Sequence, residues 1–274
     1  MESFQGKVAV VTGAGSGIGR GLAQAFAAEG MRVVAADLDE TRLGSVVDDL
    51  QAQGAECFGH VTDVGDAGAV EALAAATYDR FGGAHVVCNN AGVSSYGRQW
   101  DTTLEDWRWV IDACMWGVIH GIRSFVPRML DAGEPGHVVN TASFGGLIAS
   151  PNLGPYTAAK HAVVGISKGL RVELARTPVD VSVLCPGEVR TSIFATTRAR
   201  IEAAAEGGLA PRQQKMFDLI SGRLDTEGVE PAAAAALVVD AVRNGRFWVL
   251  PNVDAYVPLL RDEVDELLGS APEG

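Results

Sequence analysis

Basic residues are scarce in this sequence. Lysine and arginine total 22, against 34 aspartate and glutamate residues, which gives a formal net charge of −12. Nucleic acids and anionic membrane surfaces require a basic face on their protein partners. We therefore expect this chain to bind neither of them.

Cysteine and histidine are also few, and they are dispersed along the chain. No two of the four cysteines have the short spacing of a zinc or redox motif, and the five histidines lack ligand spacing as well. We therefore expect no metal site. Isolated cysteines are typical of reduced thiols, which predicts a cytoplasmic location.

Long apolar runs are missing. No stretch reaches the ~18 residues that span a bilayer, and the first seven residues contain no apolar core of a signal peptide. The length of 274 residues, of which 47% are hydrophobic, suits one large domain. Since no repeat or shift in composition divides the chain, we treat residues 1–274 as a single domain.

Short β-branched runs alternate with helix-length segments. The expected strands cover residues 8–12, 32–37, 57–63, 85–89, 137–143, 179–185 and 247–250, and the clearest helical patterns cover residues 20–29, 42–53, 67–81 and 104–130. Several of the strands are apolar almost throughout, as strands buried on both faces must be. This alternation predicts an α/β fold with a doubly wound parallel sheet.

Local signals mark the ends of some helices. Thr102, followed three residues later by Glu105, predicts a capping box at the start of the 104–130 helix. Pro231 suits the first turn of a later helix, and Gly245 follows its end.

Two segments depart from the alternation. Residues 190–228 hold two polar helical patterns with no strand between them, which indicates either a lid over a pocket or a long surface insertion. We favour the lid. The tail, residues 252–274, contains a helix whose apolar stripe must pack on its own subunit or on a neighbour. The stripe consists of Val257, Leu260, Val264, Leu267 and Leu268.

A glycine-rich turn, TGAGSGIG at residues 12–19, joins the first strand to a helix. In that context glycines let a pyrophosphate approach the free N–H groups of the helix N-terminus. Asp37 ends the second strand, where a carboxylate can bind both ribose hydroxyls and would repel a 2′-phosphate. The glycine-rich turn and Asp37 together predict NAD as the cofactor. The alternative is that they are only a tight turn and a surface acid, with no cofactor role. The predicted contacts in the turn are Gly13, Gly15, Ser16, Gly17, Ile18 and Gly19.

The third and fourth strands end in further candidate cofactor residues. Asp63 could bind the adenine amino group with Val64 donating its N–H, but an aspartate there is often a helix cap. The small residues Asn90, Ala91 and Gly92 suit a cofactor crevice at the topological switch point of the sheet. They also suit an ordinary turn.

A serine, a tyrosine and a lysine form the candidate catalytic set. Ser143 ends the fifth strand, and Tyr156 and Lys160 are four residues apart, so they share one face of a helix. A free phenol has a pKa near ~10 and is a poor base at neutral pH. The neighbouring ammonium is expected to lower that pKa, which lets Tyr156 exchange a proton with an alcohol while Ser143 holds the substrate oxygen.

Together these motifs resemble the short-chain dehydrogenase/reductase family over nearly the whole chain. The residues that carry the resemblance are 12–19, Asp63, 89–92, Ser143, 156–160, Pro186 with Gly187, and Thr191. The resemblance implies a Rossmann-type sheet of about seven strands and a homotetramer or homodimer. We expect a tetramer, with residues 104–130 and 157–176 at the interface. The resemblance also implies that Lys160 binds the nicotinamide ribose, that Thr191 binds the carboxamide, and that Pro186, Gly187 and Val189 line the cofactor site.

One position departs from the family pattern. The family usually has an asparagine in the helix before the fifth strand, where it supports a water of the proton relay, and Cys114 stands there instead. A thiol is a weak donor and acceptor. Proton release could be slower than with an asparagine, or another group could support the water. Alternatively, the role of Cys114 is to pack against its neighbours. In the last case, which we favour, an asparagine would bury an amide without full partners.

The function predicted from these residues is an NAD-dependent dehydrogenase that moves a hydride between nicotinamide and a secondary alcohol or ketone. Alternatives are a low-activity dinucleotide-binding regulatory protein, or a dehydration or epimerisation on the same site. An apolar pocket lining predicts an apolar cyclic substrate, although Arg98, Arg190 or Arg198 could reach an acidic group. The candidate lining residues are Val93, Phe144, Leu147, Leu153, Val189, Ile193 and Phe194.

Overall fold

A single seven-stranded parallel sheet forms the centre of the molecule. The computed structural model describes residues 1, 3–204, 209 and 211–270. The strands lie in the order β3-β2-β1-β4-β5-β6-β7, and every neighbouring pair is parallel. Their bounds are β1 Val8–Thr12, β2 Arg32–Asp37, β3 Cys57–Val61, β4 Val86–Asn89, β5 Gly136–Thr141, β6 Val179–Leu184 and β7 Trp248–Val249.

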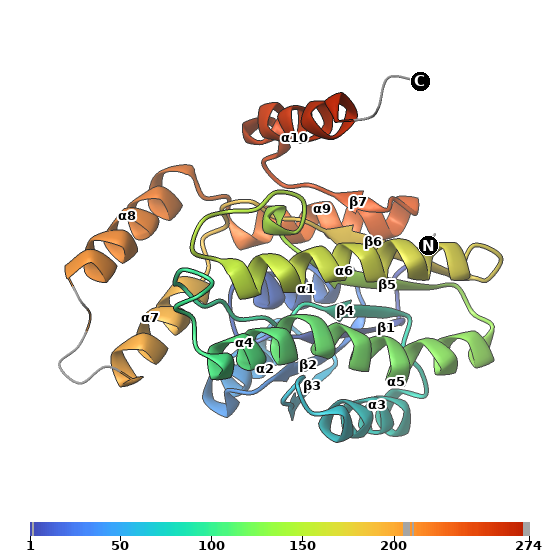
Figure 1. Cartoon of the computed structure of the whole chain (residues 1–274). Helices are drawn as coiled ribbons and strands as arrows, with labels where there is room; N and C mark the ends of the chain where they lie inside the picture. Colours follow the sequence, from blue (N-terminus) through green and yellow to red (C-terminus); the bar gives the residue numbers. More distant parts are fainter. Residues whose placement is uncertain (2, 205–208, 210, 271–274) are drawn as a thin grey trace.

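Helices cover both faces of the sheet, so the central strands β1, β4 and β5 are buried along their whole length (Figure 1). One core cluster joins the sheet to α1 Gly17–Ala28, α2 Glu40–Ala52 and α9 Pro231–Asn244. The other cluster joins it to α3 Ala67–Phe81, α5 Gly117–Ala132 and α6 Gly154–Glu173. The predicted doubly wound α/β fold is therefore confirmed.

The predicted strands agree with the observed ones to within two residues at most ends. Residues 142–143, expected at the end of the fifth strand, lie beyond β5, so Ser143 belongs to the loop after the sheet. The predicted first turn of α9 is also correct. Pro231 lies there, and Gly245 adopts a left-handed conformation immediately after the helix.

The long helix predicted for residues 104–130 is interrupted. The structure has α4 Leu104–Ile111, a π-helical turn Asp112–Trp116, and then α5. The predicted capping box is wrong by one residue, because the Thr103 hydroxyl, not that of Thr102, accepts the Asp106 N–H at 3.0 Å. The same hydroxyl donates to the Asp106 carboxylate.

Two helices lie apart from the sheet on one side of the molecule (Figure 1). They are α7 Ile193–Ala204 and α8 Pro211–Glu227, and they account for the two helical patterns in residues 190–228. Residues 205–208 and 210 of that predicted lid lie outside the described residues. A backbone bridge between Val189 and Val229 ties the two ends of the segment together.

The tail contains a short helical turn Val253–Ala255 and α10 Val257–Gly269. No residue of α10 is buried, and Leu267 is 71% exposed. Within the described residues, the start of the apolar stripe, Val257 and Leu260, is half-buried, whereas Val264, Leu267 and Leu268 are exposed. Residues 271–274 of the predicted tail lie outside the described residues.

Neither a metal cluster nor a membrane-spanning helix is present in the described part of the chain. No group of three or more histidine, cysteine, aspartate or glutamate side chains is arranged to hold a metal ion. No helix there is long and apolar enough to cross a membrane.

Candidate active site

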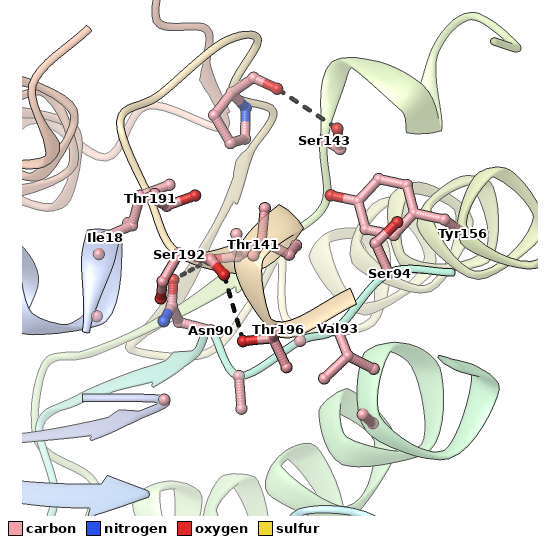
Figure 2. Close-up of a pocket in the computed structure, with 18 of the residues that line it drawn as sticks. Ile18, Asn90, Val93, Ser94, Thr141, Ser143, Tyr156, Thr191, Ser192 and Thr196 are labelled. Atoms are coloured by element: carbon pink, nitrogen blue, oxygen red, sulfur yellow. Dashed lines mark hydrogen bonds between the residues drawn. The ribbon is translucent and has the colours of Figure 1, made fainter. Parts of the chain in front are cut away.

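A cavity of about 1120 Å³ opens at the carboxyl ends of the strands. It runs from the turn after β1, past the ends of β4 and β5, to α6, the two outlying helices and the start of α10. Figure 2 shows part of this wall, with Asn90, Thr141, Ser143 and Tyr156 around one space. The position is the one expected for a ligand site in a sheet whose order reverses between β1 and β4.

Most of the predicted cofactor residues line this cavity. The exception is Gly15, whose N–H is bonded to Asp37 instead. Those that line it are Gly13, Ser16, Gly17, Ile18, Gly19, Asp37, Asp63, Val64, Asn90, Ala91, Gly92, Tyr156, Lys160, Pro186, Gly187, Val189 and Thr191.

The glycine-rich turn forms a cradle that side chains would fill. A Cβ on Gly19 would lie 2.0 Å from the carbonyl oxygen of Gly13, so only glycine allows this packing. Gly17 has a φ of +51° at the start of α1, a conformation that favours glycine. Ser16, the N-cap of α1, makes no side-chain hydrogen bond to that helix, so its first N–H groups remain open to an anion. These features fit a dinucleotide pyrophosphate.

Asp37 ends β2, three strands away from β5 and the loop that holds Ser143, so its carboxylate lies at the far end of the cavity from Ser143. One of its oxygens accepts the Gly15 N–H at 2.8 Å and the other accepts the Asp39 N–H at 3.0 Å. Arg42 also lines this end, where it is paired with Asp39 at 3.1 Å. The backbone bonds fix the carboxylate at the carboxyl end of β2, where a ribose is expected.

Asp63 is not a helix cap. Its carboxylate accepts the Gly65 N–H at 2.9 Å, and α3 is capped instead by Asp66. Asp63 therefore stays at the cavity wall together with Val64.

The Asn90 side chain is engaged within the protein. It donates to the Thr12 carbonyl at 2.9 Å and accepts from the Thr141 hydroxyl at 3.3 Å. The Thr12 hydroxyl accepts the N–H groups of Asn90 and Ala91. Thr12 thus joins the ends of β1 and β4, a role that sequence reasoning missed although the residue directly precedes the glycine-rich turn.

The three candidate catalytic side chains meet at the other end of the cavity. The Lys160 ammonium is buried and donates to the Thr141 carbonyl at 2.8 Å, and its nitrogen lies 5.5 Å from the centre of the Tyr156 ring. The Ser143 hydroxyl accepts the Gly145 N–H at 3.1 Å. Tyr156 lies beside Ser143 in Figure 2. One face of α6 and the loop after β5 therefore bring the set together.

Burial reverses the net pKa shift expected for Tyr156. Desolvation in the cavity raises the pKa of Tyr156, and the Lys160 ammonium and a hydrogen bond with Ser143 offset only part of that rise. Lys160 lowers the pKa of Tyr156, as predicted, but the rise caused by burial is larger. An additional positive charge in the cavity would be needed to bring the pKa of Tyr156 below its ordinary value.

Cys114 is fully buried in the π-helical turn and has two partners. Its sulfur accepts the Val93 N–H at 3.3 Å, and its thiol donates to the Val93 carbonyl at 3.1 Å. It also packs in a small apolar cluster with Val110 and Ala159, next to Tyr156. An asparagine side chain could use both of these partners, but its second N–H would need a further one, so the predicted cost of an asparagine at this position stays a prediction.

Six of the seven predicted substrate residues line the cavity. The seventh, Leu147, packs against the core instead. Three cations named from the sequence also lie elsewhere, with Arg98 paired to Asp101 and Arg198 to Glu202. Arg190 borders a separate, smaller pocket. The predicted substrate residues that do line the cavity are Val93, Phe144, Leu153, Val189, Ile193 and Phe194.

Several further residues line the cavity that the sequence did not predict, because the sequence does not show where their segments dock on the sheet. Arg223 of α8 reaches the wall and pairs with Glu188 at 2.6 Å. Tyr256 and Leu259 arrive from the tail. Trp109 and Ser94 come from α4 and the loop before it. No motif in the sequence marks any of them.

Helix α7 is fastened across the cavity. The Arg200 guanidinium pairs with Glu105 and with Asp106, both at 2.9 Å, and lies 4.4 Å from the centre of the Trp109 ring. The Thr197 hydroxyl donates to the Ser94 carbonyl at 2.8 Å. These contacts hold the outlying helices to α4 and to the cavity wall.

Comparison with known proteins decides the family. A sequence model described as short chain dehydrogenase matches residues 7–202, well over half of the chain. The chain belongs to the short-chain dehydrogenase family. The match covers the glycine-rich turn, Ser143, Tyr156 and Lys160. The oxidoreductase class predicted from those residues is therefore confirmed.

Similar members of the short-chain dehydrogenase family carry dehydrogenase names. The 1-deoxy-11-beta-hydroxypentalenate dehydrogenase of Streptomyces avermitilis is 38% identical over 258 residues, which cover 93% of this chain and 88% of that protein. The C alpha-dehydrogenase of Sphingobium sp. is 33% identical over 252 residues, 92% of this chain and 82% of that protein.

A solved short-chain dehydrogenase/reductase shares the whole architecture. The enzyme from Burkholderia phymatum, crystallised in complex with NAD, superposes with a TM-score of 0.91 at 39% identity, covering 100% of this chain and 99% of that one. The Rossmann-type fold expected from the resemblance is confirmed.

Proposed function

We propose that this protein is an NAD-dependent dehydrogenase that interconverts a secondary alcohol and a ketone, and that its substrate is apolar and cyclic. The observation that carries the proposal is one cavity with two ends. Ser143, Tyr156 and Lys160 line it beside β5 and α6, and the glycine cradle and Asp37 line it at the ends of β1 and β2.

In this proposal the cavity residues hold NAD, which when bound accepts a hydride from the carbinol carbon. The N-terminus of α1 binds the pyrophosphate, and Asp37 binds the adenosine ribose. Asp63 and Val64 bind adenine, Lys160 binds the nicotinamide ribose, and Thr191 binds the carboxamide. The Burkholderia phymatum relative, described as an NAD complex, supports this choice of cofactor.

The chain's own contribution to the reaction is the movement of one proton. Ser143 Oγ holds the substrate oxygen, and Tyr156 Oη takes the hydroxyl proton as the alcohol becomes a ketone. The Lys160 ammonium stabilises the phenolate in that step. In the reverse direction, Tyr156 Oη returns the proton to the oxygen.

The apolar side chains at the substrate end support an apolar substrate. Phe144, Leu153, Ile193 and Phe194 line the space next to Ser143 and Tyr156. The name of the Streptomyces relative, a hydroxypentalenate dehydrogenase, supports a hydroxylated ring compound as the class. In the same proposal residues 190–228 act as the substrate lid.

The deciding experiment is a steady-state assay of NADH formation with a panel of cyclic and open-chain secondary alcohols. We expect turnover with NAD, and kcat/KM at least about tenfold lower with NADP, because Asp37 repels the 2′-phosphate. Equal use of both dinucleotides would refute the role of Asp37. A protein that binds NAD but turns over no alcohol would instead favour the low-activity regulatory alternative.

We further propose a cytoplasmic homotetramer that acts on small molecules. The four cysteines are free and buried, which supports a reducing compartment. Exposed apolar side chains such as Leu104 and Val172, on the two helical regions expected at the interface, support assembly. Light scattering at micromolar concentration tests this, and a monomer would contradict it.

A further inference from the structure

The tail contributes an aromatic side chain to the substrate end of the cavity. Tyr256 lies between the turn Val253–Ala255 and α10, and it lines the cavity together with Leu259. The last two turns of α10 are exposed to solvent. The segment therefore meets the rest of the molecule through its first residues.

The Tyr256 ring is stacked on Phe144. The two ring centres are 3.8 Å apart and the planes are inclined by 28°. Phe144 directly follows Ser143, and its N–H donates to the Pro186 carbonyl at 2.8 Å. The stacked pair thus lies next to the side chain proposed to hold the substrate oxygen.

The backbone at Gly187 lies close to the Tyr256 ring. A Cβ on Gly187 would lie 2.3 Å from Cε2 of Tyr256, so any larger residue would displace the ring. The position of the ring is therefore set by contacts with Phe144 and with the backbone at Gly187.

A turn at Asn252 positions Tyr256 beside Phe144 and Gly187. Asn252 adopts a φ of +57°, and its side-chain amide donates to the Glu188 carbonyl at 3.0 Å. The Tyr256 N–H then closes the helical turn on the Val253 carbonyl at 2.9 Å. The tail is thus bonded to the same loop that carries Gly187, and the position of the ring depends on that loop.

We propose that Tyr256 determines the substrate range, by forming with Phe144 a flat aromatic wall that selects a ring-bearing secondary alcohol over an open-chain one. This inference rests on the proposed dehydrogenase function. A rigid ring system lays a full face on such a wall, whereas a flexible chain must lose rotational freedom to do so. The predicted lining residues gave no such wall, because Tyr256 was not among them.

The test compares two alcohols with ten carbon atoms each, tetralol and a straight-chain secondary decanol. The variants are Tyr256→Phe, which keeps the ring, and Tyr256→Leu, which keeps apolar bulk without a flat face. Leu267→Ala, on the exposed side of α10, is the matched control. The readouts are kcat/KM for both alcohols, the Kd of NADH and the melting temperature.

We expect Tyr256→Leu to lower the ratio of the two kcat/KM values, tetralol over decanol, by about tenfold, the effect of roughly 1.4 kcal/mol. Tyr256→Phe and Leu267→Ala should leave that ratio within twofold, and the Kd of NADH should not change. An unchanged ratio in Tyr256→Leu would overturn the proposal. So would an equal loss for both alcohols, which would make Tyr256 merely structural.

A second measurement separates this inference from the function on which it rests. Tetralone binding to the NADH complex is followed by titration calorimetry in the same variants. If the wild type oxidises neither alcohol, the dehydrogenase proposal fails for this class. A tenfold weaker tetralone affinity in Tyr256→Leu would then still support the wall, and an unchanged affinity, or no binding to the wild type, would overturn it.

Discussion

A single phenol carries the proposed proton transfer. Tyr156 lies on α6 beside Ser143, and its hydroxyl is the titrating group in this set. Tyr156→Phe removes that oxygen and keeps the ring, so the fold and the Kd of NAD should be retained. We expect kcat to fall by about 10²–10⁴-fold, the usual contribution of general acid–base catalysis. Near-wild-type kcat at saturating substrate would show that another group moves the proton.

The pKa of the same phenol predicts the pH dependence. Burial raises it, so the phenolate, which alcohol oxidation needs, forms only toward alkaline pH. Oxidation should therefore accelerate as pH rises, and ketone reduction should slow. Lys160→Ala removes the main opposing influence and should move the rising limb of kcat/KM to higher pH. A profile measured at saturating NAD that did not move would exclude this effect of Lys160.

Cys114 gives a third prediction for single residues. An asparagine can make the same two bonds to Val93 that the thiol makes, with only its second N–H left to be paired, so Cys114→Asn should lower the melting temperature less than Cys114→Ala does and should equal or exceed wild-type turnover. Cys114→Ala leaves the Val93 N–H and carbonyl unpaired and should cost ~1–3 kcal/mol of stability. Thermal unfolding and kcat, compared across both variants, test this. A Cys114→Asn protein that unfolds as easily as Cys114→Ala would show that sulfur is needed for packing.

Among the elements, α7 is paired with α4 through one arginine. Arg200→Ala removes two ion pairs and a cation–π contact with Trp109, which together amount to ~1 kcal/mol for exposed groups. If α7 and α8 close over the substrate, KM for the alcohol should rise several-fold while the Kd of NAD stays constant. Arg98→Ala is the matched control, since it removes an ion pair with Asp101 and a cation–π contact with Trp100, both within the loop before α4. Equal effects of the two variants would argue against a fastened lid.

The elements also mark the limits of what the sequence predicts. Strands β1 and β2 were readable because burial on both faces favours nearly continuous apolar residues. The cap of α4 was not, because Thr102 and Thr103 are adjacent and each is followed three residues later by an acid. The π-helical turn at Cys114 has no pattern of its own. The tail and α8 bring Tyr256 and Arg223 to the cavity, and no local periodicity indicates where such segments dock.

For the molecule as a whole, a buried histidine predicts acid sensitivity. His137 is buried, and its Nε2 lies 2.7 Å from the Ser182 hydroxyl, which itself donates to the Arg246 carbonyl. Nε2 must therefore carry the hydrogen, and the buried Nδ1 has no partner among the described residues. Burial lowers the pKa of His137 to about 3, because the charged ring would be desolvated.

The sign of this linkage follows from the lowered pKa. The unfolded chain takes up the proton near pH 6.5 and the folded chain only near 3, so stability is intact above that window and falls as pH decreases through it. The loss is about 1.4 kcal/mol per pH unit. His137→Gln should flatten the decline in unfolding free energy, and the exposed His161→Gln should not. Parallel curves for the wild type and His137→Gln would contradict the assignment.

The place of Tyr256 in the chain has a consequence for how such an enzyme diverges. The side chains proposed to move the proton lie on α6 and on the loop after β5, which the whole fold needs, whereas the described part of the tail that holds Tyr256 has no strand and no buried helical residue. A mutation in the tail therefore costs the fold little. Substitutions in this segment can therefore change the substrate range while Ser143, Tyr156 and Lys160 stay the same.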